Sequence, residues 1–251
     1  MANLLLFFAE RLCMRFRSPL TEAILLKRHW RFLAEIALKS QKRMMIYCPN
    51  TGPLVSCDLL GSRLWFARAL DFQKDCLPVW ELVEADGGHL ACVNKEHRIP
   101  LVVEGITRGV IQELQGYNFL QANAVYGADI AVDLILKQQG EPCFINIEAV
   151  TWCTSTGDGQ FPDSQAVGTE RLLQLMHIRA EGHRAVMLYC VPHNGVQRLR
   201  PSAAVDPNYG HVLQAAMARG VEVLVYRGRV DLQSIELDIR LPFVGLAAGL
   251  S

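Results

Sequence analysis

The stretch FINIEAVTW, residues 144 to 152, decides how the second half of the chain folds. It is an apolar run in which Asn146 and Glu148 stand two residues apart, and residues two apart in a β-strand point to the same face. The preceding apolar run, IAVDLIL (residues 130–136), holds Asp133 at its middle. An unpaired buried carboxylate is costly, so Asp133 needs a partner, a metal or a solvent-filled cleft. We expect two neighbouring strands that bring Asp133 within reach of Asn146 and Glu148.

Two acids on neighbouring strands, followed by a lysine two residues after the second, are the usual set for Mg²⁺-dependent phosphodiester cleavage. The acids hold the hard cation, the cation activates water, and the lysine orients the nucleophile. Here the spacing is present but the residue types differ. The local pattern alone therefore favours a structural polar pair over a metal site at Asp133 and Glu148.

Around this stretch, strand patterns alternate with helical ones. Expected strands cover residues 117–127, 130–136, 142–150, 184–191, 221–228 and 234–243; expected helices cover residues 99–114, 167–182 and 208–220; residues 154–163 read as a loop. The strands are nearly continuous in apolar residues, which is typical of a covered sheet. We predict a mixed α/β domain over residues 94–251.

The segment before residue 94 has a different pattern of apolar and turn residues. Short strand patterns cover residues 31–39, 44–49, 63–68, 78–85 and 89–93, separated by turn signals such as PNTGP and DGG. Five short strands in so few residues favour a small barrel over residues 27–93. Residues 1–26 are assigned as an N-terminal extension and lead-in.

Composition and charge are those of an ordinary globular protein of 251 residues with a formal net charge of zero. The first 50 residues hold nine Lys or Arg against three acids, a surplus of +6 that the rest of the chain balances. This asymmetry indicates either a polyanion-facing N-terminal part or a solvated basic surface. The eight cysteines form no CxxC pair, and the chain start lacks a signal peptide or membrane-span pattern. We expect reduced thiols, a cytoplasmic location and no membrane contact.

Several motifs resemble the sugar fermentation stimulation protein A family. YCPNTGPL (residues 47–54) is similar to that family's HCPNTG segment, and RFLAEI (31–36), CVN (92–94) and EGITRGVIQELQGY (104–117) follow in the family's order. The resemblance extends from about Met14 to Phe243, and it makes residues 1–13 an extension or a misplaced start. It implies an N-terminal OB-like five-stranded barrel packed on a C-terminal restriction-endonuclease-like PD-(D/E)xK α/β domain. It also implies binding of nucleic acid.

The chain departs from the family at the nuclease-like motif. Asp133 keeps the family's aspartate, but Ala131 stands at its arginine, Asn146 at its glutamate and Glu148 at its lysine, and FPDSQAVG lacks its acid and arginine. An amide is a weaker ligand for a hard cation than a carboxylate, and Glu148 reverses the charge that faces a phosphate. A shifted register leaves Val150 at the lysine position. Arg171, Lys137 and Arg184 are candidate replacement cations, among which the sequence selects none.

In the barrel, the resemblance and the basic surplus indicate candidate nucleic-acid contacts at Arg28, Arg31, Lys42, Asn50 and Thr51. In OB folds, a basic groove follows the phosphates and aromatic side chains stack on bases. The aromatic candidates are Trp30, Tyr47 and Trp65, and for each we expect burial in the barrel. The PNTG segment is also good turn chemistry with no ligand at all.

Three functions follow from these observations. The first is a nucleic-acid-binding protein, with DNA as the expected partner and RNA as the alternative, on a nuclease-like scaffold with a degenerate site. The second is a Mg²⁺- or Mn²⁺-dependent nuclease in which Asp133 and Glu148 bind the metal and Glu104 completes the shell. The third is a non-enzymatic regulatory adaptor, which predicts that the basic residues of the first 50 are scattered. The family name suggests a link to sugar utilisation; a homo-oligomer stays open.

Overall fold

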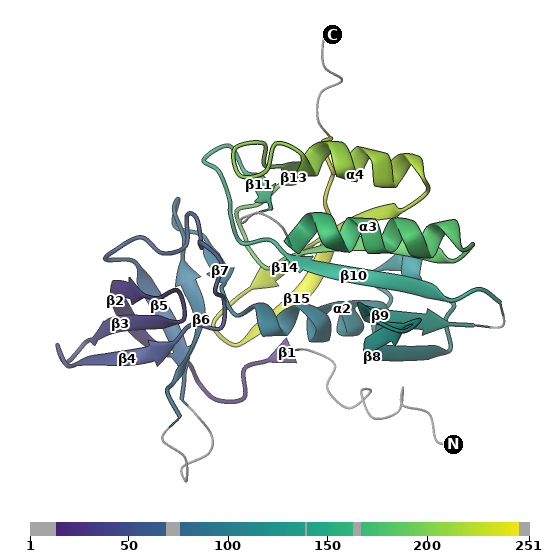
Figure 1. The fold of residues 1–251 in the computed structure, drawn as a ribbon. Helices are drawn as coiled ribbons and strands as arrows, with labels where there is room; N and C mark the ends of the chain where they lie inside the picture. Colours follow the sequence, from purple (N-terminus) through teal and green to yellow (C-terminus); the bar gives the residue numbers. More distant parts are fainter. Residues whose placement is uncertain (1–13, 69–75, 139, 163–166, 246–251) are drawn as a thin grey trace.

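The computed structural model describes residues 14–68, 76–138, 140–162 and 167–245. The predicted extension, residues 1–13, lies outside the described residues, and Met14, the alternative start, is the first described residue. The first part is a closed barrel (Figure 1). Its strands are β2 (Thr21–His29), β3 (Leu33–Leu38), β4 (Arg43–Tyr47), β5 (Arg63–Ala67), β6 (Val79–Glu84) and β7 (Leu90–Cys92). They run in the order β4-β3-β2-β5-β6-β7, and a β4–β6 pairing closes the ring.

The expected five-stranded barrel is confirmed, but its membership differs from the prediction. β2 begins at Thr21, inside the segment assigned as a lead-in, whereas β7 pairs with β6 outside the closed ring. Ala23 and Leu25 of β2 point into the core. β2 was missed because AILL is a continuous apolar run without clear alternation, and periodicity cannot assign such a run to strand or helix.

The second part is a seven-stranded sheet in the order β1-β15-β14-β12-β10-β9-β8. Its strands are β1 (Met14–Arg15), β8 (Phe119–Tyr126), β9 (Ile130–Lys137), β10 (Cys143–Ala149), β12 (Arg184–Val191), β14 (Glu222–Val230) and β15 (Ser234–Arg240). β10, β12 and β14 are parallel neighbours, and antiparallel strands flank them. The mixed α/β domain is therefore confirmed, and β1, which precedes the barrel, belongs to its sheet.

Helices cover both faces of this sheet (Figure 1). The helix α2 (Arg98–Thr107), which follows the short 3-10 helix η1 (Lys95–His97), packs on one face. The helices α3 (Val167–Ala180) and α4 (Tyr209–Ala218) pack on the other. The helix expected over residues 99–114 ends early, because Gly109 adopts a φ of 75°, and a second 3-10 helix, η2 (Gln112–Leu114), follows.

β11 (Asp158–Phe161) lies in the segment expected to be a loop, and it pairs with β13 (Arg198–Pro201) in a two-stranded parallel sheet. Contacts also join the two parts of the chain: Cys153 N donates to Ser56 Oγ at 3.2 Å, and Cys92 N donates to the Pro192 carbonyl at 2.8 Å. Among the described residues, no helix is long and apolar enough to cross a membrane.

Candidate functional site

The strands β9 and β10 meet at Asp133. Their antiparallel register pairs Cys143 with Leu136 and Ile145 with Leu134, so Asn146 and Asp133 come next. At this point, hydrogen bonds between backbone amides and side-chain oxygens replace the backbone hydrogen bonds that join the two strands. Ile147 N donates to Asp133 Oδ2 at 2.7 Å, and Asp133 N donates to Asn146 Oδ1 at 3.4 Å. The predicted approach of Asp133 to Asn146 is confirmed.

Two arginines bind the Asp133 carboxylate from different helices. Arg98, the first residue of α2, donates to Oδ1 at 3.0 Å, and Arg171 of α3 donates to Oδ2 at 2.5 Å. Both guanidiniums also donate to the Ile147 carbonyl at 3.3 Å. Because α2 and α3 lie on opposite faces of the sheet, the carboxylate is held between them.

Glu148 and Asn146 complete the cluster through Arg171. The Glu148 Oε1 atom lies 3.3 Å from Arg171 Nε, and Asn146 Nδ2 donates to the Arg171 carbonyl at 3.5 Å. The cluster thus contains two carboxylates and two guanidiniums, and its formal charges cancel. Charge balance of this kind offsets the cost of burying Asp133 without an added ion.

Arg171 is firmly charged in this environment. Burial opposes its charge, but the hydrogen bond to Asp133 and the charges of Glu148 and Asp133 outweigh that effect and raise the pKa of the guanidinium. Arg171 therefore places a fixed positive charge beside Asp133 and Glu148.

The donor set does not fit a hard divalent cation. Mg²⁺ and Mn²⁺ require several carboxylate or carbonyl oxygens around one point. Here, both oxygens of Asp133 accept bonds from arginines, and the side-chain oxygen of Asn146 accepts the Asp133 amide. A metal would have to displace Arg98 to reach Asp133 Oδ1, or Arg171 to reach Asp133 Oδ2.

The other predicted participants lie elsewhere. Glu104 pairs with Arg108 at 2.8 Å, and Arg108 also pairs with Glu236 of β15 at 3.3 Å, so the contacts of Glu104 are not with Asp133. Lys137 lies over the Phe119 ring, and Arg184 pairs with Glu222 at 2.7 Å. Of the three candidate replacement cations, the structure brings only Arg171 to Asp133. Part of the FPDSQAVG segment lies outside the described residues.

Arg98 was not among the site residues predicted from the sequence. A positive charge at the first residue of a helix is unfavourable, because the N-terminus carries the positive end of the helix dipole. Such a residue needs an acidic partner from elsewhere in the fold. An arginine directly before the apolar helix pattern at residues 99–107 is therefore a usable signal for a distant carboxylate.

In the barrel, Arg28 is a structural residue. Its buried guanidinium donates to the carbonyl oxygens of Arg31 at 2.8 Å, Asn50 at 2.5 Å and Gly52 at 2.7 Å. Asn50 in turn accepts the Gly52 amide at 2.8 Å, which closes an Asx turn. Arg28 and Asn50 thus shape the turn between β2 and β3 and the PNTG loop, while Arg31 and Thr51 are exposed beside them.

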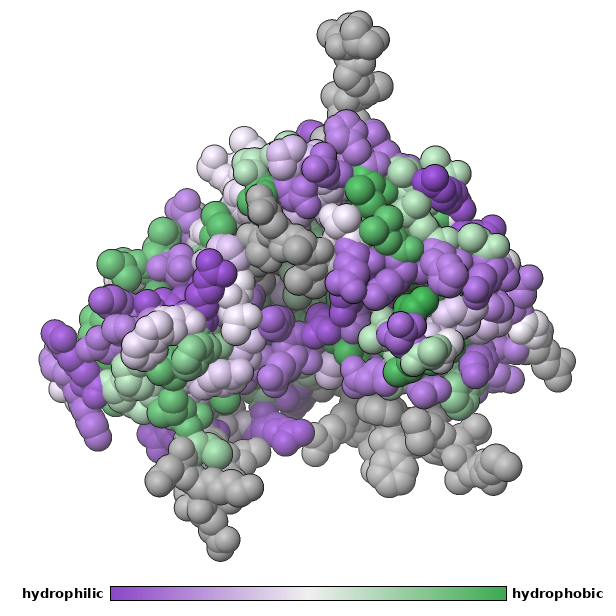
Figure 2. Space-filling view, viewed as in Figure 1, coloured by the Kyte–Doolittle hydropathy of each residue, from purple (hydrophilic) through white to green (hydrophobic). Residues whose placement is uncertain are grey.

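Three exposed aromatic side chains, Trp30, Phe32 and Tyr47, form what we term the aromatic surface of the barrel. Their exposed fractions are 77%, 43% and 37%, and the Trp30 and Phe32 rings stack with centroids 6.3 Å apart. The expected burial holds for Trp65 but is wrong for Tyr47 and for Trp30, which lies in the tight turn after β2. In Figure 2, apolar patches stand among polar residues on the barrel.

The basic residues of the barrel are not gathered beside this surface. Lys39 pairs with Glu22 at 3.1 Å and Arg43 pairs with Glu35 at 3.6 Å. Lys42 follows β3, whereas Arg31 precedes it, so the strand of about 20 Å separates them. Among the described residues of the barrel, the basic side chains of Arg31, Lys39, Lys42 and Arg43 are thus divided between the two ends of β3.

Comparisons with known proteins agree with this architecture. The family models described as "SfsA N-terminal OB domain" and "Sugar fermentation stimulation protein RE domain" match residues 26–93 and 97–234. A "Sugar fermentation stimulation protein homolog" of Pseudomonas putida is 39% identical over 91% of this chain and 98% of its own. A homolog from Pseudomonas aeruginosa is 40% identical over 91% of this chain and 99% of its own.

A solved structure has the same fold. It is described as "The structure of Pyrococcus Furiosus SfsA in complex with Ca2+", and it matches with a TM-score of 0.82 over 92% of this chain and 98% of that chain. Its sequence is 19% identical, so the likeness is one of fold.

Proposed function

The chain belongs to the sugar fermentation stimulation protein family, and from this premise we propose that it binds single-stranded nucleic acid, DNA first, and does not cleave it. The observation that carries the proposal is the exposed stack of Trp30 on Phe32 at one end of the OB barrel. Bases stack on such side chains irrespective of sequence, and each stacked base contributes about 1–3 kcal/mol.

The backbone supports the same interpretation. Trp30 and Arg31 both adopt positive φ angles, 46° and 68°, a conformation that costs a bulky residue about 1–2 kcal/mol. Strain of this kind persists where the surroundings enforce it and is concentrated at functional sites. Here Arg28 enforces it, because its guanidinium donates to the Arg31 carbonyl. The strained turn presents Trp30 to solvent with the Arg31 side chain beside it.

Binding without cleavage follows from the Asp133 cluster. Metal-assisted hydrolysis needs a cation at the carboxylates to activate water. In this chain Arg98 and Arg171 take the positions around Asp133, and Glu148 is engaged by Arg171. We assign the cluster a structural role, in which the chain's own cations replace the metal.

Fluorescence anisotropy with labelled single-stranded DNA and RNA tests the binding. We expect Trp30→Ala to weaken the affinity about 5- to 150-fold, the equivalent of one lost stacking contact. The control is Phe119→Ala, which removes an aromatic side chain of 41% exposure from β8 in the other domain. Equal affinities for the two variants, or no binding at low salt, would exclude the aromatic surface as the interface.

The scattered basic residues favour a second candidate, the regulatory adaptor, in which the aromatic surface binds a protein. Lys39 and Arg43 already pair with Glu22 and Glu35 and so offer less charge to phosphates. The same anisotropy series separates the two: an adaptor leaves every oligonucleotide unbound at low salt, whatever residue stands at position 30.

A further inference from the structure

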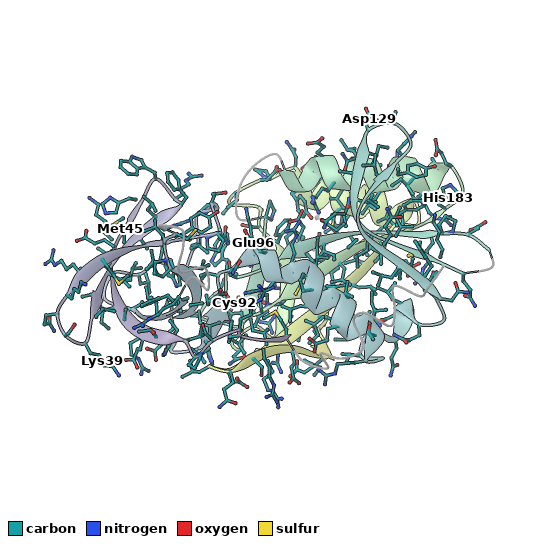
Figure 3. All side chains as sticks on the ribbon, turned by 90° about the horizontal axis from the view of Figure 1, so that it is seen from below. Lys39, Met45, Cys92, Glu96, Asp129 and His183 are labelled. Atoms are coloured by element: carbon teal, nitrogen blue, oxygen red, sulfur yellow. The ribbon has the colours of Figure 1, made fainter. Side chains whose placement is uncertain are left out.

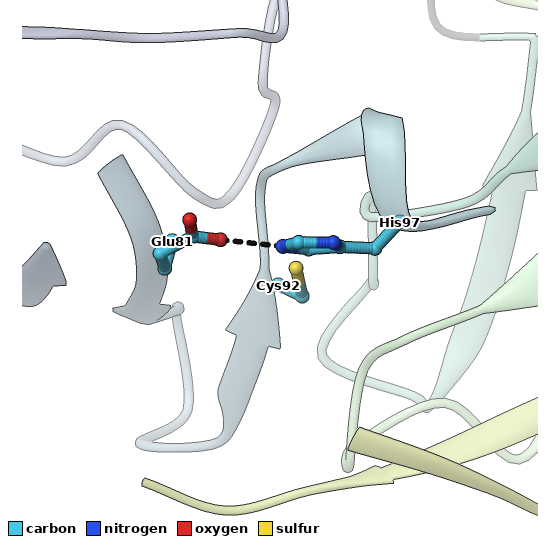
Figure 4. Close-up of side chains that lie close together, drawn as sticks. All are labelled: Glu81, Cys92 and His97. Carbon is cyan, nitrogen blue, oxygen red and sulfur yellow. Dashed lines mark hydrogen bonds and ion pairs between the residues drawn. The ribbon is translucent and has the colours of Figure 1, made fainter. Parts of the chain in front are cut away.

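A cluster of three different metal-binding side chains lies apart from both sites described above. Glu81 is on β6, Cys92 ends β7, and His97 is the last residue of η1. Their ligand atoms, a carboxylate oxygen, a thiol sulfur and an imidazole nitrogen, all lie within 4.8 Å of one another. Figure 4 shows the His97 ring directed at the Glu81 carboxylate, with the Cys92 sulfur beside both.

We propose that Glu81, Cys92 and His97 form a binding site for a thiolate-preferring divalent cation, of which Zn²⁺ is the type. Zn²⁺ takes sulfur, nitrogen and oxygen ligands at about 2.0–2.3 Å in a tetrahedron, so ligand atoms in a finished site are about 3.3–3.8 Å apart. The ligand atoms of Glu81 and His97, now 2.6 Å apart, therefore need to separate, and Cys92 Sγ needs to come within about 3.8 Å of both; side-chain rotation supplies these shifts. Sulfur and imidazole donors select Zn²⁺ over Mg²⁺ and Ca²⁺.

The ligands are already positioned by the surrounding backbone. Glu81 and Cys92 come from paired strands, in which Leu82 faces Cys92. Asn94 caps η1 through its Oδ1 atom, which accepts the Glu96 amide at 3.1 Å, and its Nδ2 atom donates to Glu81 Oε2 at 3.0 Å. These bonds fix the turn that returns His97 to Glu81, where its Nε2 lies 2.6 Å from the same oxygen. Outer contacts of this kind orient ligands in metal sites.

Burial favours a cation at this point. Glu81 and Cys92 are buried, and His97 is half-buried. A bound dication balances the thiolate and the carboxylate together, and water fills the fourth position.

The location gives the site a role. Figure 3 places Cys92 and Glu96 between the barrel, which carries Lys39 and Met45, and the α/β domain, which carries Asp129 and His183. A metal held by Glu81, Cys92 and His97 joins two barrel-side strands to the segment that leads into α2. His97 is followed directly by Arg98, so the metal also fixes the arginine that binds Asp133. We assign it a structural function as a clip between the two domains.

Cobalt and zinc titrations of the full chain, freed of metal with a chelator, test the proposal. We expect one equivalent of Co²⁺ to give a thiolate-to-cobalt charge-transfer band, Zn²⁺ to displace it, and Zn²⁺ to raise the Tm by roughly 5–10 °C at a hundredfold excess over its Kd. Cys92→Ser removes the band, whereas Cys76→Ser, at an exposed thiol, leaves it unchanged.

His97→Gln separates a metal site from a purely structural hydrogen bond. The glutamine amide still donates to Glu81, so the metal-free Tm stays near that of the parent chain, but the nitrogen ligand is lost. We expect this variant to lose both the cobalt band and the zinc-dependent rise in Tm. If the parent chain gives no band, or if His97→Gln keeps the full zinc response, the assignment is overturned and the cluster is only a hydrogen-bond network.

Discussion

Replacing Arg171 by methionine is expected to turn the Asp133 cluster into one that responds to metal. Methionine keeps much of the apolar stem but removes the guanidinium that contacts Asp133 and Glu148. Loss of one partner from a buried ion pair costs about 3–5 kcal/mol. Because Arg98 remains on Asp133, we take the lower end, about 3 kcal/mol. For a chain of this size, that loss lowers the Tm by about 6–12 °C.

Metal should then restore most of this loss. Without Arg171, Asp133 Oδ2 and Glu148 both lose a guanidinium, and a hard cation that takes its place contributes about 2.7 kcal/mol at a concentration a hundredfold above its Kd. The assay is a thermal melt of the parent chain and Arg171→Met with Mn²⁺, Mg²⁺ or a chelator. In the parent chain, Mn²⁺ or Mg²⁺ should not raise the Tm by binding at Asp133.

Arg198→Met is the matched control, because Asp158 is also bound by two arginines, Arg198 and Arg200. It should lower the Tm without creating a metal response. The reasoning is refuted if Mn²⁺ stabilises the parent chain as much as Arg171→Met, or if Arg171→Met responds no more than Arg198→Met. Adding Asp133→Asn to Arg171→Met should abolish the response.

Three more predictions concern the barrel, the interface and a buried histidine. Arg28→Lys should lower the free energy of unfolding, measured in urea, by about 2–3 kcal/mol. The reason is that an ammonium cannot reproduce the hydrogen bonds that the guanidinium donates to the carbonyls of Arg31, Asn50 and Gly52. An unchanged urea midpoint would show that these bonds are dispensable. The logarithm of the affinity for single-stranded DNA should fall with the logarithm of the salt concentration at a slope no steeper than about −1.5, since each phosphate contact contributes about −0.7 and few exposed basic residues, such as Arg31, are close to Trp30 in the chain. A slope several times steeper would indicate a basic groove instead. Burial, and next the nearby His89, lower the pKa of His193 to about 4, whereas an unfolded histidine titrates near 6.5. The contribution of His193 to the free energy of unfolding is complete above about pH 6.5 and is lost as the pH falls toward 4. The loss is about 2 kcal/mol between pH 7.5 and 5. Asparagine at position 193 can still accept the Gly195 amide, so His193→Asn should flatten this part of the stability curve; an equally steep curve would show that other groups cause it.

Strand periodicity was enough to predict the centre of the α/β domain. Alternation placed Asn146 and Glu148 on one face of β10, and the antiparallel register brings Asp133 to the same point. The cations that complete the cluster come from α2 and α3, whose orientation over the sheet depends on tertiary packing. The sequence therefore predicted Arg171 only as one of three candidate replacement cations. The single sequence signal for Arg98 is its unfavourable position at the start of a helix.

The barrel shows a different limit. Strand patterns predicted its closure, yet β2 was missed because AILL lacks alternation. Outside the barrel, β11 was predicted to be a loop because its partner β13 lies far along the chain. Trp30 was expected to be buried, as large aromatic residues usually are. Its exposure follows from a backbone turn that Arg28 stabilises from within the barrel, and such a contact between distant segments leaves no local pattern.

We propose that this chain binds single-stranded nucleic acid without metal and leaves it intact. The most direct measurement incubates the parent chain with an end-labelled single strand in Mn²⁺ or Mg²⁺ and in a chelator, and follows both the Kd and the strand length. We predict the same Kd in the two buffers and an uncut strand throughout. Cleavage that needs metal and disappears in Asp133→Asn would contradict the account.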